Sequence, residues 1–283
     1  MPRIAYVNGR YVPHGEAAVH VEDRGLQFAD SVYEVVAVVD GRPVDEEGHM
    51  VRLGRSLAEL RIGWPVADRV LRSVVREVIA QNRLTDGIVY MQVTRGVAKR
   101  DHAFPAGVRP GLIVTGRAVD RAAIERRAEQ GIAIRTMPDQ RWARRDIKAT
   151  ALLPNVLAKQ AAREAGAFEA WLVDRDGYVT EGASTNAWIV TQDGVVVTRQ
   201  RTHDILWGVT RATVIETAQK LQMRIEERPF TVDEAQAAAE AFITAATVQV
   251  LPVVTIDGIP VGAGRPGPMA RSLRAAYPFG ASR

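Results

Sequence analysis

The segment Ile189-Val-Thr-Gln-Asp-Gly-Val-Val196 places an Asp-Gly pair between two apolar runs. Glycine accepts the positive φ angle that a tight hairpin turn needs, so this segment predicts two antiparallel strands joined by a short turn. Three other Asp-Gly pairs have similar flanks, and they begin at Asp40, Asp176 and Asp257. We therefore predict that much of the protein is antiparallel sheet.

Helices are predicted between these hairpins. Apolar residues from Asp68 to Gln81 recur at the three- and four-residue spacing of an amphipathic helix. We expect further helices at about 152–165, 210–221 and 232–239. This mixture favours an α+β fold over a Rossmann sheet, and no glycine-rich phosphate loop opens any of the helices.

The middle of the chain contains a candidate domain boundary. Residues 111–116 are typical of a closing strand, and a new strand is expected to begin at Gly131. The charged segment 117–130 separates the two strands, so we place the boundary near residue 120. The prediction is a two-domain α/β arrangement, with a small N-terminal domain (1–120) and a larger C-terminal domain (121–283).

Composition excludes several classes of site. The 283 residues include no cysteine, which excludes disulfides, thiolate nucleophiles and cysteine-based zinc sites, and no metal site is predicted. We expect a cytoplasmic protein, because no apolar run approaches the ~20 residues of a membrane span and the N-terminus lacks a signal core. Basic residues are scattered apart from a cluster at Arg141, Arg144 and Arg145, which favours anionic small molecules over nucleic acid as partners.

Lys148 is a candidate reactive residue because lysine is rare here and this one stands between Ile147 and Ala149. We expect it on a partly buried strand, where loss of water leaves the amine free to attack a carbonyl. The alternative is a surface lysine whose stem covers apolar neighbours.

Two more segments suit a flat, phosphorylated ligand. Glu181 precedes Gly182 and three small residues in a predicted loop, where a ligand can approach the backbone and a carboxylate can hold a heteroaromatic N–H. The segment 205–211 opens a predicted helix, whose free N–H groups and Thr210 hydroxyl favour phosphate. An exposed turn glutamate and a threonine N-cap are the alternatives.

Arg100 and His102 are one residue apart. In an extended segment their side chains would lie on one face, where together they could bind a carboxylate. The alternative is that both are solvated charges in a loop.

In this order, the motifs resemble those of fold-type IV pyridoxal phosphate enzymes, most closely the D-amino acid aminotransferases. The resemblance runs from Tyr6 to Gly258. The matching segments are Glu22-Asp-Arg-Gly-Leu-Gln-Phe-Ala-Asp30, Val32-Tyr-Glu-Val-Val36, His49-x-x-Arg52-Leu53, Gln92-Val-Thr-Arg-Gly96, Asp146-Ile-Lys148, Val156-Leu-Ala-Lys-Gln160, Val179-Thr-Glu-Gly182, Ile205-Leu-x-Gly-Val-Thr-Arg211 and Leu251-Pro-Val253.

The resemblance implies pyridoxal 5'-phosphate as the cofactor, with Lys148 forming its Schiff base and later moving a proton. It implies that Glu181 pairs with the ring nitrogen and that Leu206 packs on the ring. Phosphate contacts are implied for Arg52, Val209, Thr210 and the backbone at Ala246. Ala246 departs from the family, which commonly has a threonine there, so one hydroxyl contact worth roughly 0.5–1.5 kcal/mol is missing.

The resemblance also implies transamination between a D-amino acid such as D-alanine and a 2-oxo acid such as 2-oxoglutarate. Tyr33, together with Arg100 and His102 from a partner subunit, is implied to hold the substrate carboxylate, so a homodimer is expected. The alternatives within the fold are a branched-chain L-amino acid aminotransferase, an aminodeoxychorismate lyase and an (R)-amine transaminase; outside it, a non-catalytic binding protein. The Arg-x-His spacing favours the D-amino acid family.

Overall fold

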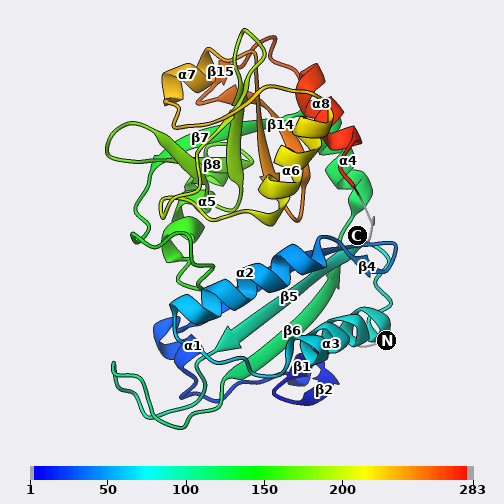
Figure 1. Cartoon of the computed structure of the whole chain (residues 1–283), viewed down its shortest axis with the longest axis vertical. Coiled ribbons are helices and arrows are strands. Elements are labelled where there is room, and N and C mark those ends of the chain that lie inside the picture. Colours follow the sequence, from blue (N-terminus) through cyan, green and yellow to red (C-terminus); the bar gives the residue numbers. More distant parts are fainter. Residues whose placement is uncertain (1–2, 279–283) are drawn as a thin grey trace. The chain divides into compact units, whose positions relative to one another are not determined.

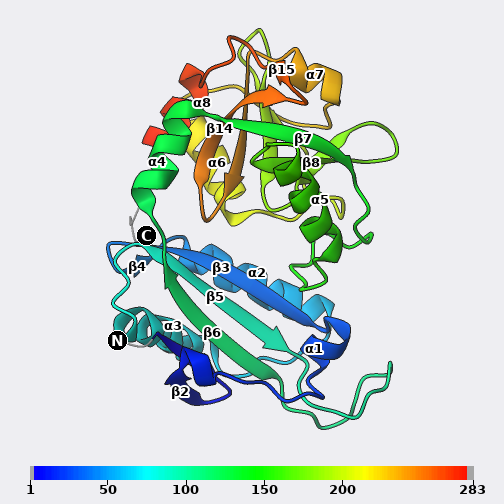
Figure 2. The same cartoon turned by 180° about the vertical axis from the view of Figure 1, so that it is seen from behind.

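The structure is a computed structural model that describes residues 3–278. The chain folds as two compact units, which are drawn in Figures 1 and 2. The first unit contains residues 3–120 and 147–151, and the second contains residues 121–146 and 152–278. We predicted Lys148 in the C-terminal domain, whereas it packs as part of the first unit.

The first unit is an antiparallel six-stranded sheet in the order β2-β1-β6-β5-β3-β4. Helices α2 and α3 lie on one face of this sheet, and the apolar core lies beneath them (Figures 1 and 2). The elements are β1 (Ile4–Val7), β2 (Arg10–Pro13), η1 (His14–Glu16), α1 (Arg24–Phe28), β3 (Ser31–Val39), β4 (Arg42–Pro43), α2 (Glu46–Glu59), α3 (Asp68–Gln81), β5 (Gly87–Thr94) and β6 (Gly111–Ala118).

The second unit is built on a nine-stranded mixed sheet, in the order β12-β11-β10-β13-β14-β7-β8-β9 with β15 paired to β14. Its core contains buried side chains such as Trp171, Phe230 and Leu251. The elements are α4 (Arg121–Gln130), β7 (Ile132–Pro138), α5 (Leu153–Glu164), β8 (Glu169–Val173), β9 (Val179–Gly182), β10 (Asn186–Val190), β11 (Val196–Thr198), α6 (Val209–Lys220), β12 (Ile225–Glu227), α7 (Val232–Gln236), β13 (Glu240–Ala245), β14 (Gln249–Ile256), β15 (Ile259–Pro260) and α8 (Pro268–Ala275).

The four predicted hairpins are confirmed. The Asp-Gly pairs join β3 to β4, β8 to β9, β10 to β11, and β14 to β15, each as antiparallel neighbours. At Asp40 and Gly41 the φ angles are 50° and 73°, the paired positive values of a tight primed turn. The helix predicted over 68–81 has those bounds, and 210–221 corresponds to α6.

Three local predictions need correction. Lys148 lies in an irregular segment instead of a strand, because only Ala149 beside it makes an isolated bridge, to Val32. Glu181 lies within strand β9 instead of a loop. Helix α7 ends at Gln236, three residues before the predicted end at 239. In addition, the charged segment after residue 117 contains helix α4, for which no prediction was made. Within residues 3–278, no helix is long and apolar enough to cross a membrane.

Candidate active site

Lys148 is fixed through its backbone to strand β3. Its carbonyl oxygen accepts a hydrogen bond from the Tyr33 N–H at 3.0 Å, and its own N–H donates to Ser56 Oγ on α2 at 3.3 Å. The half-buried side chain lies against Tyr33, with Nζ 4.3 Å from the ring centroid. This distance suits a cation–π contact, which holds the amine over the ring. The first unit therefore brings two predicted site residues, Lys148 and Tyr33, together.

Arg52 lies on α2 within a buried ionic cluster. Its Nε and Nη2 atoms donate to the two carboxylate oxygens of Glu34, both at 2.7 Å, and His49 Nδ1 lies 2.7 Å from Glu34 Oε2. Burial raises the pKa of Glu34, but Arg52 and His49 outweigh this and lower it to about 2. Glu34 is therefore charged, and it fixes the plane of the Arg52 guanidinium.

Glu181 is 4% exposed and accepts three hydrogen bonds. The donors are Arg141 Nη1 at 2.5 Å, the Leu206 N–H at 3.0 Å and Asn186 Nδ2 at 2.9 Å. Asn186 Nδ2 also donates to the Leu206 carbonyl at 3.1 Å, so both backbone groups of Leu206 are held. Burial raises the pKa of Glu181, and the opposing effect of Arg141 does not cancel it.

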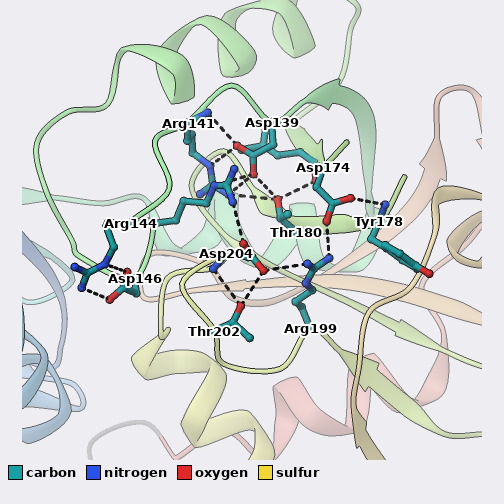
Figure 3. A network of polar contacts seen from close by, with 12 residues as sticks. Asp139, Arg141, Arg144, Asp146, Asp174, Tyr178, Thr180, Arg199, Thr202 and Asp204 are labelled. Carbon is teal, nitrogen blue, oxygen red and sulfur yellow. Dashed lines mark hydrogen bonds and ion pairs between the residues drawn. The ribbon is translucent and has the colours of Figure 1, made fainter. Parts of the chain in front are cut away.

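Arg141 continues into a chain of alternating charges, shown in Figure 3. Arg141 Nη2 donates to Asp139 at 2.8 Å, and the series ends where Arg199 donates to Asp174 at 2.9 Å. We call it the ion-pair chain; its members are Glu181, Arg141, Asp139, Arg145, Asp204, Arg199 and Asp174. Because Arg199 and Asp204 belong to this set, and the Leu206 N–H donates to its member Glu181, the ion-pair chain fixes the segment 199–206 that leads to Leu206.

Helix α6 begins as an anion site requires. Its N-cap is Gly208, not Thr210, and no side chain caps it. A Cβ at Gly208 would overlap Asn186 Oδ1, so glycine is needed for this close approach. The first-turn N–H groups, which have no partner within a helix, include those of Val209 and Thr210.

Two further residues test whether a phosphorylated ring fits the second unit. Ala246 follows β13 in a turn and offers backbone groups only. Thr185 Oγ1 is buried without a hydrogen-bond partner among the described residues. An unpaired buried hydroxyl, an uncapped helix start and a buried acid with a raised pKa together suit a ligand that carries phosphate and a basic ring nitrogen.

Arg100 and His102 are both exposed and lie in bends rather than an extended segment. The structure nevertheless brings them together, because both contact Phe28: the Arg100 guanidinium carbon is 5.0 Å from its ring centroid, and the His102 ring is 5.4 Å away. A shared aromatic support therefore replaces the strand geometry that the sequence suggested.

Comparison with known proteins decides the family. A family model described as "Amino-transferase class IV" matches residues 31–256. The chain belongs to the class IV aminotransferases. D-alanine aminotransferase from Bacillus licheniformis is 41% identical to it over 95% of this chain and 94% of its own length.

Two solved class IV relatives have similar structures. The branched-chain aminotransferase of Escherichia coli has a TM-score of 0.89 at 28% identity, covering 97% of this chain and 93% of that one. The branched-chain aminotransferase of T.th., solved with pyridoxamine 5'-phosphate, also has a TM-score of 0.89 at 28% identity, covering 98% and 93%. The predicted family and α+β fold-type IV class are thus confirmed.

Sequence reasoning missed the groups that hold the site residues of this class IV aminotransferase. Arg141 was noticed only as part of a basic cluster, and its pairing with Glu181 depends on a contact across 40 positions. Glu34 and Asn186 lie inside strands β3 and β10, and neither carried a separate signal in the sequence.

Proposed function

We propose that this class IV aminotransferase moves an amino group from a D-amino acid, such as D-alanine, to a 2-oxo acid, such as 2-oxoglutarate. The observation that carries the proposal is the near full-length similarity to D-alanine aminotransferase. The predicted cofactor, pyridoxal 5'-phosphate, agrees with family membership, and when bound it would supply an aldehyde that takes up the amino group and a ring that withdraws electrons from the substrate. We place the enzyme in the cytoplasm.

Two residues carry the proton chemistry in this proposal. Lys148 holds the cofactor and then moves a proton at the α-carbon of the substrate, with its amine kept half-buried over Tyr33. Glu181 holds the proton on the ring nitrogen. Its raised pKa lies nearer to that of a heteroaromatic nitrogen, and Arg141 and Asn186 keep its carboxylate in place.

The remaining site residues bind and orient. Arg52, Val209 and Thr210 hold the phosphate together with backbone groups at Ala246, and Leu206 packs on the ring. Tyr33 with Arg100 and His102 of a partner subunit binds the substrate carboxylate, so the working form is a homodimer. The exposure of Arg100 and His102 within one chain supports this arrangement.

A branched-chain L-amino acid aminotransferase is the second candidate, because the solved relatives described above carry that name. The two candidates differ in the enantiomer consumed, since both take an amino donor with a carboxylate. Activity confined to L-leucine and L-valine would select the second candidate.

The decisive experiment tests D- and L-amino acids against 2-oxoglutarate with the wild-type holoenzyme. We expect D-alanine to yield pyruvate, and the Lys148→Ala variant to lose about 10⁶-fold in rate, as when a covalent catalyst is removed. Lys220→Ala, which changes an exposed lysine at the end of α6, is the matched control and should keep full activity. Borohydride reduction followed by mass spectrometry should find the cofactor on the Lys148 peptide; its absence there would refute the assignment.

A further inference from the structure

One carboxylate holds two arginines in the first unit. Asp30 lies between α1 and β3 with a side chain that is 11% exposed. It accepts from Arg24 Nε at 2.8 Å, and from Arg95 Nε and Nη2 at 2.7 and 2.9 Å. Burial raises the pKa of Asp30, but Arg95 and Arg24 outweigh this and lower it. Asp30 is therefore charged at neutral pH.

Arg24, the first of these arginines, binds the segment that carries the predicted carboxylate-binding pair. Its Nη1 donates to the Asp101 carbonyl at 2.5 Å and its Nη2 to the His102 carbonyl at 3.4 Å. Its guanidinium carbon is 4.7 Å from the centroid of the Phe28 ring, which also supports Arg100 and His102. Arg24 itself is only 3% exposed, so it is a rigid anchor for exposed residues.

Arg95, the second arginine, holds the next part of the same segment. Its guanidinium carbon is 3.6 Å from the centroid of the Phe104 ring, which is 49% exposed. Arg95 also donates to the carbonyls of Leu60 at 2.8 Å and Arg61 at 3.1 Å. Asp30 thus fixes two guanidinium groups: Arg24 binds the carbonyls of Asp101 and His102, and Arg95 lies against the Phe104 ring.

We propose that Asp30 is a positioning residue for substrate-carboxylate recognition, acting through Arg24 and Arg95 on the segment 100–104. The inference rests on the proposed function, in which Arg100 and His102 bind that carboxylate. The β5–β6 connection that contains them extends beyond the end of the sheet (Figure 2). Its other contacts in the first unit include Arg61 against the Phe104 ring and the Ala98 N–H, which donates to the Glu22 carbonyl. A displacement of about 1 Å in a binding group costs substantial affinity, and buried anchors limit such displacement.

The test uses Asp30→Asn in the holoenzyme, which keeps the side-chain size and removes the charge. We expect the KM for D-alanine to rise about tenfold while kcat changes less than about threefold, because ground-state and transition-state binding are lost together. The KM for (R)-1-phenylethylamine, a donor without a carboxylate, should not change. Trypsin cleavage after Lys99 and Arg100 should become about tenfold faster, since the segment loses its anchors.

Two variants make the result specific. Arg24→Lys keeps the positive charge but not the forked contacts, so it should raise the same KM and the same cleavage rate. Glu47→Gln removes one partner of an exposed ion pair with Arg72 and should change neither. If the Asp30→Asn variant does not fold, the KM and the cleavage rate of Arg24→Lys test the proposal instead.

Unchanged cleavage and an unchanged KM in these variants would overturn the proposal and leave the proposed function intact. A fall in kcat at constant KM would overturn it as well, because the effect would then lie in the chemistry. If the wild-type holoenzyme does not transaminate D-alanine, the proposed function fails first, and with it the assigned role of Arg100 and His102. The cleavage rates would still show whether Asp30 anchors the segment.

Discussion

Two buried glutamates each face an arginine, yet their electrostatics are opposite. Glu34 receives both arms of Arg52 and a contact from His49, and its pKa falls to about 2. Glu181 receives one arm of Arg141, which also serves Asp139, and its pKa is raised by burial. The two carboxylates differ in their positive partners: Arg52 directs two donors at Glu34, whereas Glu181 shares Arg141 with Asp139.

Under the proposed function, this contrast separates a carboxylate that fixes Arg52 from a carboxylate that faces the ring nitrogen. A carboxylate with a dedicated guanidinium stays ionised and anchors the fold. A carboxylate whose arginine is shared along a chain of ion pairs keeps an affinity for protons, which is what a group facing a ring nitrogen requires.

The largest expected effect comes from breaking the Glu34 pair. Glu34→Gln leaves Arg52 buried without its counter-ion, so the free energy of unfolding should fall by about 3–5 kcal/mol. Urea unfolding of the apoenzyme measures this. Glu181→Gln should cost clearly less, because Arg141 keeps Asp139 as a partner. Equal losses in the two variants would remove the distinction between the two sites.

For enzymatic activity we expect the opposite ranking, with Glu181→Gln causing the larger loss. Glu181→Gln keeps the shape of the side chain but cannot carry the charge that holds a proton on the ring nitrogen, so kcat/KM should fall about 10²-fold. Steady-state assays with D-alanine and saturating cofactor measure it. A Glu181→Gln enzyme with wild-type kcat/KM would show that this carboxylate is only structural.

The smallest expected effect is a difference in acid stability. The pKa of Glu34 lies below its ordinary value of 4.5, so its stabilisation is present above that value and is lost as the pH falls toward 2. Between pH 6 and pH 3 the stability advantage of wild type over Glu34→Gln should shrink by about 2 kcal/mol. Denaturant unfolding across this range tests it, and an advantage that stays constant would mean that Glu34 does not titrate as described.

Local signals in the sequence predicted much of the fold. The Asp-Gly turns and the helix at 68–81 depend on neighbouring residues, and both agree with the structure. Helix α2 was not predicted, because polar residues occupy several of its buried positions. These residues are His49, Arg52 and Ser56. These polar residues interrupt the apolar period because they serve the ionic cluster and the backbone of Lys148.

The order of the motifs along the chain predicted which residues belong to the candidate site, but not their hydrogen-bond partners. The resemblance named Lys148, Glu181 and the start of α6, but it did not indicate which groups hold them. Arg141 and Leu206 meet Glu181 across 40 and 25 positions, and such contacts leave no periodic pattern in one sequence. Lys148 was expected in a strand because its neighbours are apolar; their burial instead comes from packing in the core of the first unit.

The five residues 147–151 have a consequence for synthesis on the ribosome. They complete the first unit, yet the chain makes them only after it has begun the second at residue 121. A nascent chain that stops at residue 120 lacks the partner for Val32 and the carbonyl that Tyr33 binds. The first unit therefore stays unfinished, without Lys148, until residue 151 has left the exit tunnel.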